Sequence, residues 1–296
     1  MTQSNGPALV ILAAGMGSRY GGYKQLDSVG AEDESIMELS IGDAIKAGFR
    51  KVVLVINAQI AKQVEEQIIL KYQQRVEIKT VFQELKDLPS GFDLPPQRKK
   101  PWGTAHAILS ARKEISTPFV VINADDYYGR SSFGQIKEEL VSLSQDQYRF
   151  VMLGYRLENT LSSHGGVSRG LCRIDNNKLL SIKEIINIRK TNGRIVGDQN
   201  GQEVVLSSQD IVSMNFWGFT PRIFSLLEEQ FRVFLRSRIA DPQAEFFITN
   251  ALDEAIASGL SKVKVLTTAE RWYGVTFRED RDEVRRGIQE YLADKR

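Results

Sequence analysis

Two cations lie among closely spaced glycines near the start of the chain, in the sequence LVILAAGMGSRYGGYKQL at residues 9–26. Glycine lets backbone N–H groups approach an anion closely, while arginine offers a planar fork of donors and lysine a mobile point charge. Arg19, Lys24 and the backbone from Gly15 to Ser18 therefore predict a phosphate-binding loop. A structural turn with solvated charges would give the same pattern, so the residues alone leave both interpretations open.

Two common phosphate-binding patterns do not fit this loop. The pattern G-x-x-x-x-G-K-[ST] fails because Tyr23 separates Gly22 from Lys24. The dinucleotide pattern G-x-G-x-x-G fails because Tyr20 takes the place of its last glycine, and the next strand ends in Asn57 instead of an acid. If the loop binds phosphate, it does so as a site of another kind.

A pair of acids, Asp125 and Asp126, follows the apolar run Phe119–Asn123, which is typical of a buried strand. A carboxylate at the end of a parallel strand projects from the sheet edge where ligands bind, and Mg²⁺ prefers carboxylate and phosphate oxygens. Such a pair also occurs in ordinary turns. A magnesium site and a structural turn are therefore both compatible with these residues.

The first half of the chain alternates short apolar runs with segments of helical spacing. The runs predict strands at 9–13, 51–57, 76–82 and 119–123, with helices between them at 36–48, 58–73 and 103–115. Past residue 155, shorter strands with turn signals indicate antiparallel pairing. We expect an α/β fold, Rossmann-like, with three α/β/α layers, a mostly parallel mixed central sheet and a smaller antiparallel portion.

Composition narrows the class of protein. The chain has 296 residues, a net charge of +2 and one cysteine, Cys172. We expect one domain over 1–296, with halves near 1–150 and 151–296, and no binding to nucleic acid or membrane. A lone cysteine and the lack of an apparent signal peptide favour a cytoplasmic protein. The two histidines, His106 and His164, suggest no nucleophile–histidine grouping.

Three motifs then give a resemblance. LAAGMGSRYGGYKQL resembles the signature L-A-A-G-x-G-[ST]-R…K of the sugar-1-phosphate nucleotidyltransferases. GTAHAI at 103–108 is similar to the nucleotide-binding helix of the N-acetylglucosamine-1-phosphate uridylyltransferases, and VINADDYYG to the strand whose terminal Asp holds magnesium. The short spacing from Arg19 to Lys24 is nearer to the R-x-G-G-x-K of the molybdopterin-nucleotide transferases.

The resemblance implies a reaction and a nucleotide site. A sugar 1-phosphate oxygen attacks the α-phosphorus of a nucleoside triphosphate in line, and pyrophosphate leaves. Since the nucleophile is already an anion, charge neutralisation and alignment matter more than a general base. Arg19 would hold the β and γ phosphates, Lys24 would bridge the α-phosphate and the sugar phosphate, and Asp125 would bind Mg²⁺. The implied nucleotide-binding residues are Ala13, Ala14, Gly15, Gly17, Ser18, Gln83, Gly103 and Thr104.

The metal and sugar sites depart from the family pattern. Many relatives carry W-x-D near the C-terminus, and RWYGVT places Gly274 at that Asp and leaves Thr276 as a ligand candidate beside Asp125 and Asp126. On the sugar side, HGGV, LLSIKEI and SMNFWGF match family segments, which implies sugar contacts. The implied sugar-binding residues are Gly166, Glu184 and Asn215. The lysine that usually follows the glutamate is Ile185 here.

Base choice rests on Gln83, at the end of its strand, where the resemblance implies an amide facing the pyrimidine edge; a solvated glutamine at a strand end would give the same pattern. An amide pairs with uracil or thymine through a donor and an acceptor, so we expect UTP, with dTTP or CTP as alternatives. The proline-rich segment at 88–101 is expected to be a surface loop and a candidate lid.

Two other functions stay open. The spacing of Arg19 and Lys24 favours a cytidylyltransferase for a small phosphorylated alcohol or a molybdopterin-type substrate. Gly274 in place of the usual Asp and Ile185 in place of the usual lysine keep a non-catalytic nucleotide-sugar sensor open. A homo-oligomer is also left open.

Overall fold

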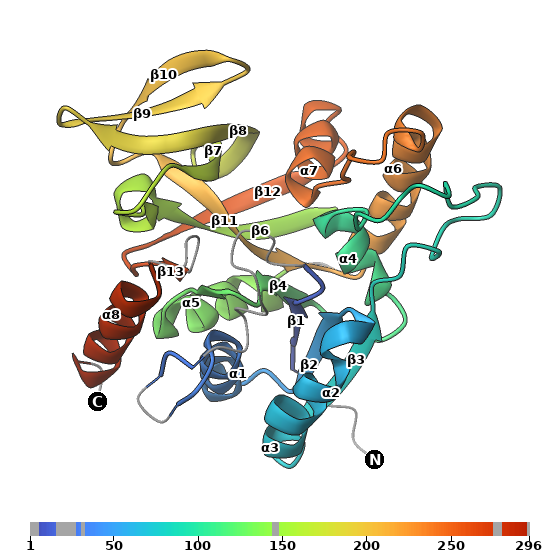
Figure 1. The fold of residues 1–296 in the computed structure, drawn as a ribbon, viewed down its shortest axis with the longest axis horizontal. Helices are drawn as coiled ribbons and strands as arrows, with labels where there is room; N and C mark the ends of the chain where they lie inside the picture. Colours follow the sequence, from blue (N-terminus) through green and yellow to red (C-terminus); the bar gives the residue numbers. More distant parts are fainter. Residues whose placement is uncertain (1–5, 16–27, 31–32, 144–147, 275–279, 295–296) are drawn as a thin grey trace.

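The computed structural model describes residues 6–15, 28–30, 33–143, 148–274 and 280–294. A mixed 11-stranded sheet runs through these residues (Figure 1). The strand order is β10-β9-β8-β12-β6-β11-β4-β1-β2-β3, and β7 pairs with β8 and β11. The strands of this sheet are β1 (Ala8–Leu12), β2 (Lys51–Ile56), β3 (Glu77–Phe82), β4 (Phe119–Asn123), β6 (Arg149–Arg156), β7 (Val167–Asp175), β8 (Lys178–Thr191), β9 (Arg194–Gln199), β10 (Gln202–Leu206), β11 (Ile211–Phe219) and β12 (Lys262–Thr268).

The centre of this sheet is mostly parallel, as predicted. β3, β2, β1 and β4 are parallel neighbours, and β12 is parallel to β6. β11 lies between β4 and β6 and is antiparallel to both. A separate two-stranded ladder joins β5 (Asp126–Tyr127) to β13 (Tyr273–Gly274).

Helices cover both faces of the sheet, which confirms the three-layer α/β/α architecture (Figure 1). Alternate residues of β1 divide between two cores: Leu9 and Ile11 pack in one, Val10 and Leu12 in the other. The first core lies under α1, α3 and α5, and the second under α4, α6 and α7. The helices are α1 (Ile36–Ala47), α2 (Ala61–Val64), α3 (Leu70–Tyr72), α4 (Thr104–Ser110), α5 (Arg130–Val141), α6 (Arg222–Arg238), α7 (Ile248–Ala257) and α8 (Asp280–Asp294).

Local sequence explains where α1 begins and ends. Ser35 and Glu38 form a capping box at its start, and Gly48 adopts φ 92° at its end. The predicted helix at 58–73 is helical but interrupted, because a π-helical turn over Glu65–Ile69 separates α2 from α3.

The antiparallel portion is built from hairpins that extend the central sheet. β7, β8, β9 and β10 pair in sequence order, and β7 and β8 also pair with the central strands β11 and β12. The tight turns use residues that tolerate positive φ, as the turn signals predicted. These residues are Asn176, Asn177, Asn192, Gly193, Asn200 and Gly201.

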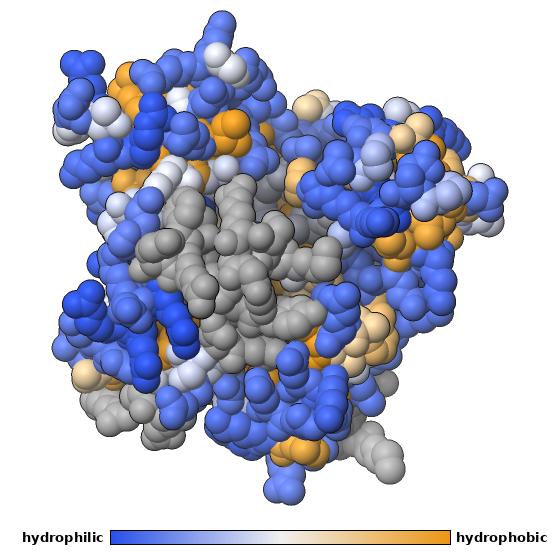
Figure 2. All heavy atoms as spheres, viewed as in Figure 1, coloured by the Kyte–Doolittle hydropathy of each residue, from blue (hydrophilic) through white to orange (hydrophobic). Residues whose placement is uncertain are grey.

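The visible face of the molecule is mainly hydrophilic (Figure 2). Hydrophobic side chains also reach the surface on the outlying strands, where Ile186 and Val205 are exposed. Among the described residues, no helix combines the length and the apolar character needed to cross a bilayer.

Candidate functional site

The carboxyl ends of four parallel strands align at one edge of the sheet. Leu12 is in register with Val55 and Asn123, and Ile56 is in register with Phe82. The residues that follow these strands therefore emerge side by side. Ala13 follows β1, Gln83 follows β3 and Asp125 lies beyond β4. These candidate residues thus lie along the edge where open α/β sheets bind ligands.

The exit from β1 is held in place by the neighbouring strand. Ala13 and Ala14 are buried, whereas Gly15 is exposed. The Asn57 side chain donates from Nδ2 to the Ala14 carbonyl at 3.1 Å, and its Oδ1 accepts from the Gln59 N–H at 2.9 Å. Asn57, the residue that argued against a dinucleotide site, therefore positions the start of the glycine-rich loop.

The remaining residues of the predicted phosphate loop lie outside the described part of the chain. They are Gly17, Ser18, Arg19 and Lys24. Thr276, the third candidate metal ligand, lies outside it as well. The roles assigned to these residues stay predictions.

The acid pair lies directly beyond β4. Asp125 is half-buried, while Asp126 is buried with 8% of its surface exposed. Oδ2 of Asp126 accepts hydrogen bonds from Asn123 Nδ2 at 2.8 Å and from the Tyr128 hydroxyl at 3.3 Å. These donors stabilise a carboxylate at a fixed position.

A chain of hydrogen bonds connects Asp126 to Asn215 on β11. Asn215 Nδ2 donates to Asn123 Oδ1 at 2.7 Å, and Trp217 Nε1 donates to Asn215 Oδ1 at 3.0 Å. Asn215 lies where the register of β11 against β6 shifts, and it has a φ of 63°. The structure therefore brings together a candidate metal ligand and a candidate sugar-binding residue, with Asn123 between them. Sequence reasoning did not identify Asn123.

Gly274 has a steric reason to be glycine. It pairs with Asp126 in the short β5–β13 ladder. A Cβ atom at this position would lie 2.8 Å from Asp126 Oδ1 and would overlap the Trp272 ring. An acid at position 274 would require the indole to move and would place a second negative charge beside Asp126. Among the described residues, no three His, Cys, Asp or Glu side chains gather as a metal cluster.

Arg169 is a buried cation that sequence reasoning missed. Its guanidinium stacks on Trp272 at 4.6 Å from the ring centroid and donates to the carbonyls of Thr160 and Ser168. Its Nε has no hydrogen-bond partner in the described structure. Burial lowers the pKa of Arg169 to about 10, and the negative charge of Asp126 opposes that shift. An arginine within a strand carries no spacing signal that would have singled it out.

The three residues expected at the base lie together, but two of them have structural roles. Gln83 Nε2 donates to the Gly103 carbonyl at 3.0 Å. Gly103 has φ 107°, and a Cβ there would lie 2.6 Å from the Phe246 carbonyl oxygen. Thr104 Oγ1 accepts from the Ile248 N–H at 3.0 Å. Packing against the Phe246 backbone is therefore sufficient to require glycine at position 103, without a base.

The other sugar-side candidates lie on the antiparallel strands. Glu184 on β8 is exposed and is in register with Gly170 of β7, which is itself in register with Ser213 of β11. Gly166 precedes β7, and a Cβ there would collide with Asn187. No hydrogen bond among the described residues joins Glu184 or Gly166 to Asn215. Ile185, at the position of the usual lysine, is fully buried.

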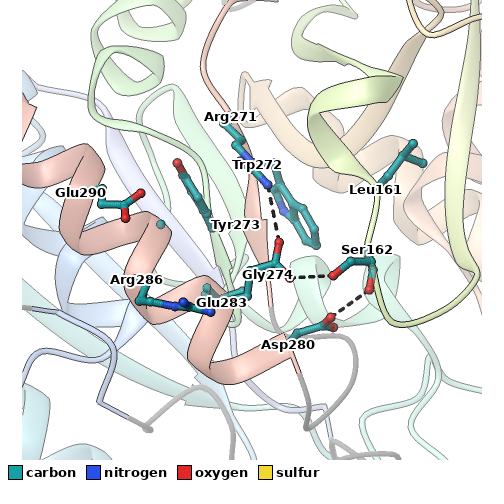
Figure 3. Close-up of a pocket in the computed structure, with 13 residues that line it drawn as sticks. Leu161, Ser162, Arg271, Trp272, Tyr273, Gly274, Asp280, Glu283, Arg286 and Glu290 are labelled. Carbon is teal, nitrogen blue, oxygen red and sulfur yellow. Dashed lines mark hydrogen bonds and ion pairs between the residues drawn. The ribbon is translucent and has the colours of Figure 1, made fainter.

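A pocket of about 190 Å³ lies beside Gly274, between α8 and β13 (Figure 3). Ser162 Oγ donates to Asp280 at 2.8 Å, and Ser163 Oγ donates to Glu283 at 2.6 Å across its rim. Trp272 also lines the pocket. None of the predicted site residues within the described part of the chain lines it, and Asp125 and Asp126 are not among its lining residues.

The architecture and the edge residues define a class: a Rossmann-like α/β protein with an acid pair beyond the fourth parallel strand. Residues 8–275 match the nucleotidyl transferase family. The chain belongs to this family of enzymes, which confirms the resemblance seen in its motifs. No curated protein matches the sequence.

Solved structures share this fold over nearly the whole chain. An inositol-1-phosphate CTP transferase from T. maritima has a TM-score of 0.63 and 14% identity, with 97% of this chain and 98% of that chain covered. A putative glucose-1-phosphate thymidylyltransferase from Bacillus anthracis has a TM-score of 0.64 and 13% identity, with 95% and 94% covered. A UDP-glucose pyrophosphorylase complexed with UDP-glucose has a TM-score of 0.60 and 17% identity, with 98% and 100% covered.

Proposed function

We propose that the enzyme joins a sugar 1-phosphate to a nucleoside triphosphate and releases pyrophosphate. The observation that carries this proposal is the hydrogen-bonded chain from Asp126 through Asn123 to Asn215. At one end of this chain is a carboxylate that can bind the metal of a metal–triphosphate. At the other end is an amide that can bond to a sugar hydroxyl. The similar structures include enzymes named for glucose 1-phosphate and for UDP-glucose.

The reaction forms one phosphorus–oxygen bond and breaks another. An oxygen of the sugar phosphate bonds to the α-phosphorus, and the bond to the β-phosphate oxygen breaks, so that pyrophosphate leaves with its electron pair. Asp125 and Asp126 would supply the hard oxygen ligands that Mg²⁺ prefers, and their small number suits an ion that keeps water and phosphate ligands. When bound, Mg²⁺ neutralises charge on the phosphates. Arg19 and Lys24 hold the triphosphate.

Asn215 aligns the sugar in this proposal. Its Oδ1 accepts from Trp217 and one N–H of its amide donates to Asn123. A second N–H remains for a sugar hydroxyl, since an amide nitrogen carries two hydrogens. Orientation by the protein supplies much of the rate in a reaction that needs no general base.

A second candidate function is cytidylyl transfer to a small phosphorylated alcohol. It is compatible with Gln83, whose amide nitrogen is directed at the Gly103 carbonyl and at Nδ1 of His106 and so cannot donate to O4 of uracil. The similarity to an inositol-1-phosphate CTP transferase over 97% of the chain points the same way.

Pyrophosphate release tests both functions. UTP, CTP, dTTP and ATP would each be incubated with Mg²⁺ and hexose 1-phosphates or inositol 1-phosphate. We expect turnover with UTP and a hexose 1-phosphate, and its loss in Asp125→Ala and Lys24→Ala with the fold intact. Turnover only with CTP and inositol 1-phosphate would establish the second function instead. Nucleotide-sugar binding without any pyrophosphate release would indicate a sensor and refute both.

A further inference from the structure

The side chain of Gln83 is held by two partners inside the protein. Nε2 donates to the Gly103 carbonyl oxygen at 3.0 Å and lies 3.3 Å from Nδ1 of His106. The other ring nitrogen of His106, Nε2, lies 2.9 Å from the carbonyl oxygen of Asp87. His106 is 1% exposed, and the pocket that it lines lies with Asp87 and Arg112, so it acts on a ligand beside Gln83 through the Gln83 amide.

The positions of the protons follow from these partners. The Asp87 carbonyl can only accept, so His106 Nε2 carries the proton, and Nδ1 of the neutral ring is an acceptor. Burial lowers the pKa of His106, which favours the neutral ring. One N–H of Gln83 therefore bonds to Gly103 and the other to His106.

The reversed orientation of the Gln83 amide is disfavoured. It would place Oε1 against both the Gly103 carbonyl oxygen and the lone pair of His106 Nδ1, which are two acceptors. The observed orientation leaves Oε1 with no hydrogen-bond partner among the described residues. Gln83 thus offers a ligand an acceptor and no donor.

We propose that His106 is a positioning residue for base selection, because it fixes Gln83 as an acceptor-only group. This inference rests on the proposed function, in which Gln83 faces the base. The group of the base that meets Oε1 is then an N–H donor: N3–H of uracil or thymine, or the 4-amino group of cytosine. At either position a fixed acceptor suits only one pyrimidine, because cytosine N3 and uracil O4 are themselves acceptors, whereas a freely rotating amide would turn to suit both.

Two substitutions of His106 separate this role from packing. Asparagine places an amide oxygen near the position of Nδ1, so His106→Asn keeps an acceptor for Gln83. Glutamine places an amide nitrogen near the position of Nε2, so His106→Gln keeps the bond to Asp87 but not that acceptor. The measurements are kcat/KM with UTP and CTP at one sugar 1-phosphate, and Kd for each nucleotide by calorimetry without the second substrate.

We expect the wild type and His106→Asn to share one UTP-to-CTP selectivity within about twofold. We expect the UTP-to-CTP selectivity of His106→Gln to be about tenfold lower, because the loss of one hydrogen bond of about 1.4 kcal/mol corresponds to a factor of ten. Unchanged selectivity in folded His106→Gln, or equal losses in both variants, would overturn the proposal. If no nucleotide gives pyrophosphate, the proposed reaction fails, while the Kd ratios still decide the role of His106.

Methylated nucleotides test the wild type directly, without any change to the protein. If the enzyme prefers UTP, we expect 3-methyl-UTP, which lacks the N3–H, to bind at least tenfold more weakly. If it prefers CTP, we expect the same of N4,N4-dimethyl-CTP. Undiminished affinity for the relevant analogue, or no binding of either parent nucleotide at millimolar concentration, would overturn the proposal.

Discussion

Asn123 is the residue at which the metal side and the sugar side of the candidate site meet. It is the last residue of β4, and its amide donates to Asp126 and accepts from Asn215. Its backbone N–H also donates to the Tyr128 hydroxyl at 3.1 Å. A single amide thus sets the position of two functional side chains from different strands.

Replacing Asn123 with alanine removes both side-chain bonds. Since hydrogen bonds to charged groups contribute about 1.5–3 kcal/mol, we expect kcat/KM to fall roughly tenfold to a hundredfold. Pyrophosphate release would measure this loss, and urea unfolding would measure stability. Asn250→Ala, at an exposed position on α7, is the matched control and should change neither quantity. Equal turnover in the two variants would refute the role of Asn123.

His106 also makes stability depend on pH. Its lowered native pKa means that the unfolded chain binds a proton near pH 6.5 before the native chain does. The stability that neutral His106 confers is therefore present above about pH 6.5 and is lost as the pH falls below it. From pH 6.5 to 5, we expect the free energy of unfolding to fall more steeply in the wild type than in His106→Asn. The two slopes should differ by at most about 1.4 kcal/mol per pH unit. If urea unfolding gave the same pH dependence of the free energy of unfolding for both proteins, the prediction would be contradicted.

The steric demand at Gly274 is testable with alanine. A Cβ at this position overlaps the Trp272 ring and approaches Asp126, so we expect Gly274→Ala to destabilise the fold by about 1–3 kcal/mol. Gly134, in the middle of α5, provides the control, because a methyl group added there would meet nothing within 4 Å apart from its chain neighbours and the backbone of its own helix. We expect Gly134→Ala to stabilise by about 0.5–1 kcal/mol. Equal effects of the two substitutions in urea unfolding would contradict this explanation.

At the scale of elements, the connection between β3 and α4 is fastened to the second core by Arg98. Arg98 is 3% exposed, donates to four backbone carbonyls and stacks on Trp102 at 3.5 Å from the ring centroid. Two of those carbonyls, of Asp241 and Ala244, follow α6. The role of a lid stays a prediction, and the sequence shows the prolines of this segment but not the partners of its arginine.

Removing the arginine should loosen this connection. We expect Arg98→Ala to lower stability by about 2–4 kcal/mol, since buried carbonyls lose charged donors. Limited proteolysis should then cleave within residues 84–102. The neighbouring exposed residue gives the control, Lys99→Ala, which we expect to resist the protease as the wild type does. An equally resistant Arg98→Ala would contradict the fastening role.

The elements that sequence predicted are those with local signals. β4 was expected at the residues where it is found, and Gly48 and the Asn-Gly turns fix ends and hairpins through their own φ preferences. The bulge at Asn215, the β5–β13 ladder and the stacking of Arg169 on Trp272 were not predictable. Each depends on pairing between residues far apart in sequence, which no local period encodes.

At the scale of the whole molecule, the two halves share one sheet. β11 and β4 join the antiparallel portion to the parallel centre, and β6 with β12 continues the sheet beyond them. We expect one cooperative calorimetric transition over residues 1–296, with a calorimetric enthalpy equal to the van't Hoff enthalpy. Two separate transitions would show that the halves fold independently and would contradict a single domain.

The left-handed backbone at Asn215 limits how this position can change in related chains. Asparagine, aspartate and glycine adopt a φ of 63° at little cost, whereas branched side chains adopt it only with strain. Of these three, asparagine alone both accepts from Trp217 and donates to Asn123. Substrate preference could therefore diverge through the residues around this position more readily than through the position itself.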